Sequence, residues 1–192
     1  MKYFGAKSLI SIIFLITAIP IAVYIINPFN VKTEKVRPRL FGVDFYSLPT
    51  NSMAPTLVPG DYLLVSNMAY LEQSPQRHDV IVFNKHFEEK ITPFVKRVLA
   101  VGGETVKISQ GIVLIDNQAI QEKYIEKNNN KKSYSQNMSE KEVPKGMLFV
   151  LGDNRDNSND SRFMGFVAIK DVIGKATSLL YGKNGRTGNP IK

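Results

Sequence analysis

Three short stretches of the chain carry side chains that could do chemistry without a metal ion. The first, residues 48–57, reads Leu-Pro-Thr-Asn-Ser-Met-Ala-Pro-Thr-Leu. Pro49 and Pro55 flank its hydroxyl-rich turn, and proline fixes its own φ angle, so the loop around Ser52 is expected to be rigid. Taken alone, this pattern is typical of a surface loop. It becomes a candidate site because it presents an alcohol near its tip.

The second stretch, residues 93–103, places a lysine inside an apolar run that reads Pro-Phe-Val-Lys-Arg-Val-Leu-Ala-Val-Gly-Gly. In an extended strand, Lys96 would share a face with Phe94 and Val98. Burial removes water from an ammonium group and lowers its pKa from about 10.4, by up to about 3–5 units when burial is complete. A lysine that is neutral near physiological pH can serve as a general base. The alternative is that its amine reaches solvent at the sheet edge.

The third stretch, residues 152–166, is a dense polar run between strand-like segments. A calcium loop is the obvious alternative, but the acidic residues lack the EF-hand spacing and no glutamate closes the loop at the twelfth position. Asp160 and Arg162 could instead form a structural ion pair. The hydroxyl of Ser158 could orient an amine.

Composition excludes several other kinds of site. The chain has 192 residues and a formal net charge of +8, and it contains no cysteine and only two histidines. A thiol nucleophile, an iron–sulfur cluster, a cysteine zinc site and a three-histidine metal centre are therefore excluded. We expect no cofactor and no metal. The lysines and arginines are scattered rather than gathered in one stripe, so we expect no nucleic-acid binding.

The N-terminal region predicts a membrane anchor. Residues 9–26 contain no charge, and about 18–20 apolar residues in a helix span the hydrocarbon core of a bilayer. We expect a short cytoplasmic segment at 1–7 and a transmembrane helix at 8–26. A cleaved signal peptide is the alternative, but no small-x-small cleavage site follows. The lysines and arginines flanking the span slightly favour a cytoplasmic domain.

The remaining chain predicts an all-β or β-dominated domain. Residues 27–47 form a connector and a first strand region, and residues 48–192 form the domain that would carry the chemistry. The polar segment at about 117–143 is expected to be a solvated surface insertion. Strand-like runs separated by glycine and proline turns are Tyr62–Val65, Val80–Phe83, Phe94–Val101, Thr105–Ile108, Ile112–Ile115, Met147–Leu151, Val167–Ile169 and Thr177–Tyr181.

In this order, the three stretches resemble the type I signal peptidase family, which are membrane-anchored serine proteases with a Ser–Lys dyad. The matching boxes are Ser-Met-x-Pro-Thr-Leu, Lys-Arg-Val and Gly-Asp-Asn-x-x-x-Ser-x-Asp-Ser-Arg. The resemblance covers about residues 47–182 together with the anchor. It implies that Ser52 is the nucleophile and Lys96 the general base. It also implies that the Thr50 hydroxyl helps the Ser52 N–H hold the oxyanion, and that Ser158 orients the lysine amine.

The same resemblance assigns supporting and substrate-binding residues. Asp160 and Arg162 match a supporting ion pair, and Asp153 belongs to the same scaffold. The apolar side chains that would line shallow pockets for small substrate side chains are Leu48, Val95 and Met53.

The resemblance implies a catalytic domain on the outer, periplasmic face of the cytoplasmic membrane, which conflicts with the weak charge bias. Its partners would be membrane lipid and secretory precursor proteins, cut after small residues at −1 and −3 of the signal peptide. Two alternatives stay open. One is a specialised peptidase that matures pilin or conjugation substrates; the other is a catalytically silent, membrane-tethered binding domain. Self-cleaving repressors share the dyad, but they are soluble and lack the third box.

Overall fold

The computed structural model describes residues 6–31, 33–87, 90–183 and 185–191, and it is β-dominated as the sequence predicts. All eight predicted strand runs overlap strands, and only Val167–Ile169 extends beyond its strand, by one residue. The strands are β1 Val43–Ser47, β2 Tyr62–Ser66, β3 Val80–Phe87, β4 Lys90–Val101, β5 Thr105–Ser109, β6 Ile112–Ile115, β7 Gln118–Ala119, β8 Met138–Glu142, β9 Met147–Leu151, β10 Val167–Ala168 and β11 Val172–Tyr181.

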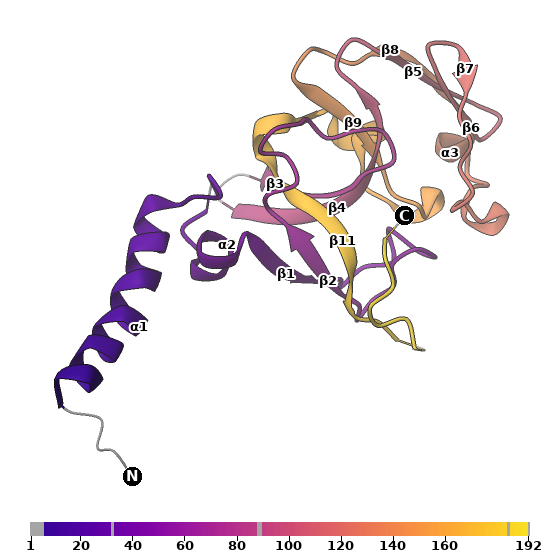
Figure 1. The fold of residues 1–192 in the computed structure, drawn as a ribbon. Coiled ribbons are helices and arrows are strands. Elements are labelled where there is room, and N and C mark those ends of the chain that lie inside the picture. Colours follow the sequence, from indigo (N-terminus) through magenta and orange to yellow (C-terminus); the bar gives the residue numbers. More distant parts are fainter. Residues whose placement is uncertain (1–5, 32, 88–89, 184, 192) are drawn as a thin grey trace.

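The helix α1, Ala6–Ile26, projects away from the β-rich body (Figure 1). Large apolar side chains are exposed along it, among them Phe14 at 68% and Ile25 at 70%. Within the described ranges, no helix has both the length and the apolar character of a membrane crossing. The other helices are short: α2 Val36–Phe41, α3 Ser133–Gln136 and α4 Ser161–Met164.

The strands form two antiparallel sheets. The larger sheet has the order β1-β2-β11-β3-β4-β9-β10, and the smaller has the order β7-β6-β5-β8. Side chains along a strand point alternately to its two faces. In β2, Leu63 and Val65 are fully buried on one face, whereas Tyr62 on the other face is 47% exposed. One apolar cluster packs Leu63 and Val65 against Met53 and Leu57 of the Ser52 loop. The core of the larger sheet therefore also supports that loop.

One edge of β4 is only partly paired. Its residues 90–97 pair with β3, but pairing with β9 on the other side begins only at Arg97. Among the described residues, no strand is paired with this side of β4 between Lys90 and Lys96. β1 likewise stands at the end of the sheet order. Both edges retain backbone groups that could pair with an added strand.

The polar segment at 117–143 is mostly exposed, and it has secondary structure of its own. It contains β7, a 3₁₀ turn at Lys127–Asn129, α3 and β8. β8 pairs with β5, and the Asp156 carboxylate accepts hydrogen bonds from the backbone N–H groups of Lys131 and Lys132. Because β8 is a half-exposed edge strand, its sequence Met-Ser-Glu-Lys-Glu lacks the apolar alternation by which strands are recognised.

Candidate active site

The loop that carries Ser52 is fixed at both ends. Leu48 N–H donates to the Asp61 carbonyl oxygen at 2.9 Å, and Gly60 N–H donates to the Leu48 carbonyl oxygen at 2.8 Å. These two bonds continue the β1–β2 pairing into the loop. Inside the loop, Met53 and Leu57 are fully buried. Ser52, between these anchors, is only 9% exposed. The loop is therefore a built part of the domain and not a mobile surface turn.

The structure brings three predicted side chains together around the Ser52 hydroxyl. Lys96 Nζ lies 2.9 Å from Ser52 Oγ and donates a second hydrogen bond to the Val95 carbonyl oxygen at 3.0 Å. Thr50 Oγ1 lies 3.2 Å from Ser52 Oγ. A nucleophile and a base within hydrogen-bond distance of each other are the first geometric requirement of covalent catalysis.

The amine of Lys96 is nearly enclosed. Its residue is 3% exposed, and Nζ lies 5.5 Å from the centroid of the Phe94 ring. Burial lowers the pKa of Lys96 to about 8, although the negative charges of Asp160 and Asp153 act in the opposite direction. A substantial fraction of the amine is therefore neutral slightly above physiological pH, as the sequence predicts.

The third stretch holds the backbone of Ser52. Asn154 N–H donates to the Ser52 carbonyl oxygen at 3.1 Å. Gly152 lies so close to this carbonyl oxygen and to Ser158 Oγ that a Cβ at position 152 would collide with both. The Asp160 carboxylate accepts from Gly152 N–H at 3.0 Å, which fixes the glycine in place. The absence of a side chain at this position is what allows the two loops to meet.

Two buried ion pairs stabilise this arrangement. Arg162 forms a two-pronged pair with Asp160, at 2.8 and 2.9 Å. Arg97 forms a similar pair with Asp153, at 2.9 and 2.7 Å. Such paired, hydrogen-bonded charges give geometric specificity. Both predicted aspartates thus hold guanidinium groups, and neither makes a hydrogen bond to the Lys96 amine in the described structure.

Two predicted residues have different surroundings from those expected. Ser158 Oγ is buried and makes no hydrogen bond within the described structure, so it does not orient the Lys96 amine here. The hydrogen bonds of that amine go to Ser52 and Val95 instead. Met53 is fully buried in the apolar cluster beneath the loop and does not line the groove that opens over Ser52 and Lys96. Its side chain is needed as an anchor of the loop because the following residues turn back over the core.

A groove of about 380 Å³ opens over Ser52 and Lys96. The predicted Leu48, Thr50, Ser52, Val95 and Lys96 all line it. Lining residues that sequence reasoning missed are Tyr46, Ser47, Pro49, Thr92, Pro93, Phe94, Asn157 and Asn159. Several of these are neighbours of predicted residues on β1 or β4. Alternation along these strands could have identified them only if the unpaired edge of β4 had been known.

Sequence reasoning also missed Arg97, Thr56 and Glu122. Arg97 is fully buried and its guanidinium lies 3.9 Å from the centroid of the Tyr124 ring. Thr56 Oγ1 donates to Asp153 at 2.5 Å, which ties the Ser52 loop to the third stretch. Glu122 forms an ion pair with the buried Arg155. Arg97 is a second cation inside the apolar run of β4, and a buried arginine needs a carboxylate partner. This residue could therefore have indicated that a carboxylate lies close to the strand.

No cluster of three or more metal-ligating side chains occurs among the described residues. The arrangement itself offers the Ser52 alcohol, the Lys96 amine and the Thr50 hydroxyl. These are the components of acyl transfer through a serine nucleophile.

Comparison with known proteins assigns this chain to a family. The family model described as "Signal peptidase, peptidase S26" matches residues 6–181. A probable signal peptidase I-1 from Synechocystis sp. is 39% identical over 144 residues, covering 72% of this chain and 71% of that protein. A signal peptidase I from Leptolyngbya laminosa is 36% identical over 160 residues, covering 79% and 76%. The crystal structure of a signal peptidase I from Enterococcus faecalis V583 shares 32% identity with a TM-score of 0.46, covering 55% of this chain and 98% of that one. The chain belongs to the signal peptidase family, peptidase S26.

Proposed function

We propose that this chain is a signal peptidase I that cleaves signal peptides from precursor proteins, with Ser52 as nucleophile and Lys96 as general base. The observation that carries the proposal is the 2.9 Å separation between Lys96 Nζ and Ser52 Oγ, together with the burial that lowers the pKa of that lysine to about 8. An amine that is easily deprotonated beside an alcohol is suited to activating it.

In the first step, the neutral Lys96 amine removes the proton of Ser52 as Oγ attacks the carbonyl carbon of the scissile bond. The oxyanion that forms is held by the Ser52 backbone N–H and by the Thr50 hydroxyl. One such donor is typically worth about 2.7–4 kcal/mol of transition-state stabilisation. The position of Thr50 Oγ1, 3.2 Å from Ser52 Oγ, supports this role.

In the second step, the protonated Lys96 gives its proton to the leaving amine, and an acyl-enzyme remains on Ser52. A water molecule then loses a proton to the neutral Lys96 and releases the acyl group. The ammonium form that exists between these transfers is favoured by the negative charges of Asp160 and Asp153. Those charges limit the fall of the lysine pKa, so that the amine can both take up and return a proton.

The substrate is an extended segment with small side chains at −1 and −3. The groove supports this proposal because it lies between β1 and the unpaired stretch of β4, and an extended peptide can add to such an edge. Leu48 and Val95 in its lining would limit the size of the side chains that fit.

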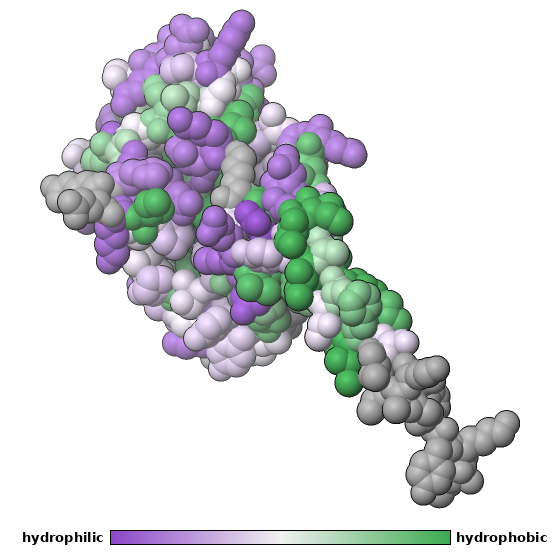
Figure 2. Space-filling view, turned by 90° about the vertical axis from the view of Figure 1, so that its left-hand side faces the viewer, coloured by the Kyte–Doolittle hydropathy of each residue, from purple (hydrophilic) through white to green (hydrophobic). Residues whose placement is uncertain are grey.

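The proposed location is the cytoplasmic membrane, with α1 as a single anchor and the catalytic domain on its outer face. Support comes from the apolar side chains that α1 exposes, and Figure 2 shows that this apolar surface continues onto the adjoining part of the domain. In intact spheroplasts, added protease should digest the domain. Complete protection of the domain would contradict the proposed orientation.

Cleavage of a precursor tests the dyad. Ser52→Ala and Lys96→Ala should each reduce kcat/KM by about 10⁴-fold or more, as the removal of members of such catalytic sets does. Matched controls are Ser109→Ala and Lys107→Ala, both on β5 of the smaller sheet. Unchanged cleavage by both dyad variants would falsify the mechanism.

The same assay separates the alternatives. A catalytically silent binding domain predicts no cleavage by the unmodified protein. A specialised enzyme predicts cleavage of one class of precursor, such as pilin, and none of a general panel.

A further inference from the structure

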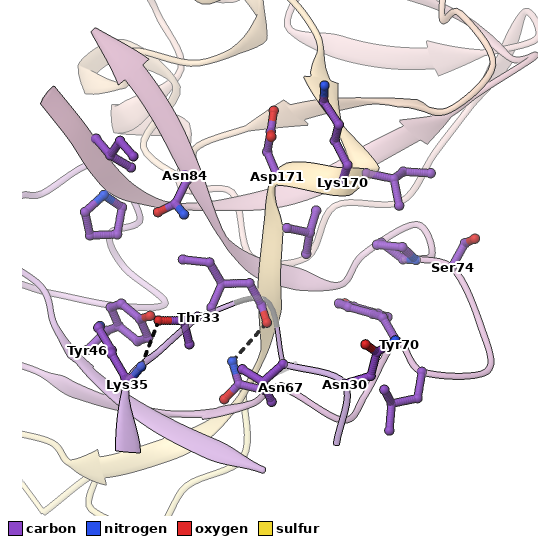
Figure 3. A pocket seen from close by; sticks show the side chains of 18 of the residues that line it. Asn30, Thr33, Lys35, Tyr46, Asn67, Tyr70, Ser74, Asn84, Lys170 and Asp171 are labelled. Carbon is purple, nitrogen blue, oxygen red and sulfur yellow. Dashed lines mark hydrogen bonds between the residues drawn. The ribbon is translucent and has the colours of Figure 1, made fainter. Parts of the chain in front are cut away.

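A second cavity lies beside the active groove and plays no part in the chemistry proposed above. It has a volume of about 560 Å³, within the range of sites that bind small molecules or peptide segments. Its walls come from the connector after α1, the loop between β2 and β3, the β3–β4 hairpin and the start of β11. Figure 3 shows Tyr46 and Asn84 at one side of the cavity and Tyr70 and Ser74 at the other.

The cavity and the active groove share part of their lining. Tyr46 of β1 and Pro93 of β4 line both. Along β4, Lys96 and Val95 face the groove, Pro93 lies at the junction and Ile91 lies in the cavity. This is the stretch of β4 that lacks a partner strand on one side. A peptide added to this edge would therefore run from the reactive pair directly into the cavity.

We propose that this cavity binds the part of the precursor that lies immediately N-terminal to position −3, at about −4 to −8. The inference rests on the proposed function and adds a second binding site for the same substrate. With the side chains at −1 and −3 against Leu48 and Val95, the chain upstream continues toward Pro93. Strand residues rise about 3.3 Å each, so about four further residues reach the level of Ile91.

The side chains that line the cavity fit a segment of the precursor that lies between its polar cleavage site and the apolar part of its signal peptide. Ile91 and Leu71, which line this cavity, are 55% and 46% exposed. An apolar side chain of the substrate would bury both. Asn84 and Ser74 add side chains that can hydrogen-bond to a peptide backbone.

The position of the cavity relative to α1 supports the same occupant. The connector residues Asn30, Val31 and Thr33 form one wall, and they follow α1 directly in the chain. If α1 is the membrane anchor, the cavity lies between the bilayer and Ser52. A precursor held in the membrane by its apolar segment must cross this distance to reach the nucleophile.

The test compares two peptide substrates that share one cleavage site. One begins at −3 and the other begins at about −8, and kcat/KM is measured for each. We expect the longer peptide to be cleaved roughly tenfold more efficiently, since binding energy from remote residues can be used in the transition state. Asn84→Trp and, on the opposite wall, Ser74→Trp should fill the cavity and bring the ratio of the two values close to one.

The control is Lys107→Trp, which adds the same ring at an exposed position of the smaller sheet, outside the cavity lining and the groove, and should preserve the ratio. Equal cleavage of the two peptides by the unmodified protein would overturn the inference, as would a ratio that survives both cavity substitutions. Neither result affects the proposed function, which fails only if the unmodified protein cleaves neither peptide or if Ser52→Ala cleaves them equally well.

Discussion

Lys96 and Arg97 are neighbouring cations on β4, but their surroundings shift their pKa values in opposite directions. Lys96 is 3% exposed and Arg97 is fully buried, so burial does not distinguish them. Lys96 makes its hydrogen bonds to a hydroxyl and a carbonyl oxygen, whereas Arg97 forms a two-pronged ion pair with Asp153. Burial lowers the pKa of Lys96 to about 8. Burial would also lower the pKa of Arg97, but the hydrogen bonds and charge of Asp153 outweigh it and raise that pKa.

This difference shows how one strand can serve both chemistry and structure. A buried cation beside a carboxylate keeps its proton and fixes geometry. A buried cation beside neutral groups gives up its proton more readily and becomes a base. The carboxylates of Asp153 and Asp160 lie close enough to influence Lys96 but are engaged by Arg97 and Arg162. The arginines therefore protect the lysine from direct pairing.

The largest expected effect on stability follows from removing the ion pair between Arg97 and Asp153. Asp153→Asn removes the two-pronged carboxylate partner of the buried Arg97 guanidinium, which should lower the free energy of unfolding by about 3–5 kcal/mol. Urea unfolding measures it. In the matched control Lys35→Met, the lost ion pair has a lysine side chain that is 59% exposed. That loss should cost less than about 1 kcal/mol. Similar losses in both variants would contradict the distinction drawn here.

A smaller effect of opposite sign is expected on the catalytic side. The folded-state pKa of Lys96, about 8, lies below its ordinary value of 10.5. Between these values the unfolded chain binds more protons, so the stability of the unmodified protein rises with pH. Lys96→Met removes this cost and should raise the free energy of unfolding near pH 7 by up to about 3 kcal/mol. The gain in stability should fade as the pH approaches the pKa of a free lysine amine, 10.5. A gain that is independent of pH would point to packing alone.

The smallest expected effect concerns the hydroxyl beside the dyad. Thr50→Val keeps the shape of the side chain and removes its donor, and it should lower kcat roughly tenfold to hundredfold, because the Ser52 N–H remains. Thr50→Ser restores the hydroxyl and should recover most of the activity. Equal loss in both variants would assign Thr50 a packing role.

The sequence predicted the parts of the molecule that depend on local pattern. The strand runs were recognisable because Leu63, Val65 and their counterparts alternate with exposed residues between glycine turns. Ser52 and Lys96 were recognisable from their boxes, and the structure places their reactive atoms together.

The parts that escaped prediction depend on contacts between distant segments. The strand β8 is polar and is defined by pairing with β5 across the chain. The partner of Arg97 lies 56 residues away, so no local signal identifies it. Met53 was assigned to substrate binding because it adjoins Ser52 in sequence, but the turn of the loop directs it into the core. Ser158 has the right position in its box, yet its hydroxyl makes no hydrogen bond in the described structure.

The most direct test of the central claim is the pH dependence of acylation, measured as the single-turnover rate on a precursor peptide. The account predicts a rate that rises with pH and levels off above an apparent pKa close to 8, as burial of the Lys96 amine requires. A rate that is flat across this range, or that rises only near the pKa of a free lysine, would show that no amine of this kind activates Ser52.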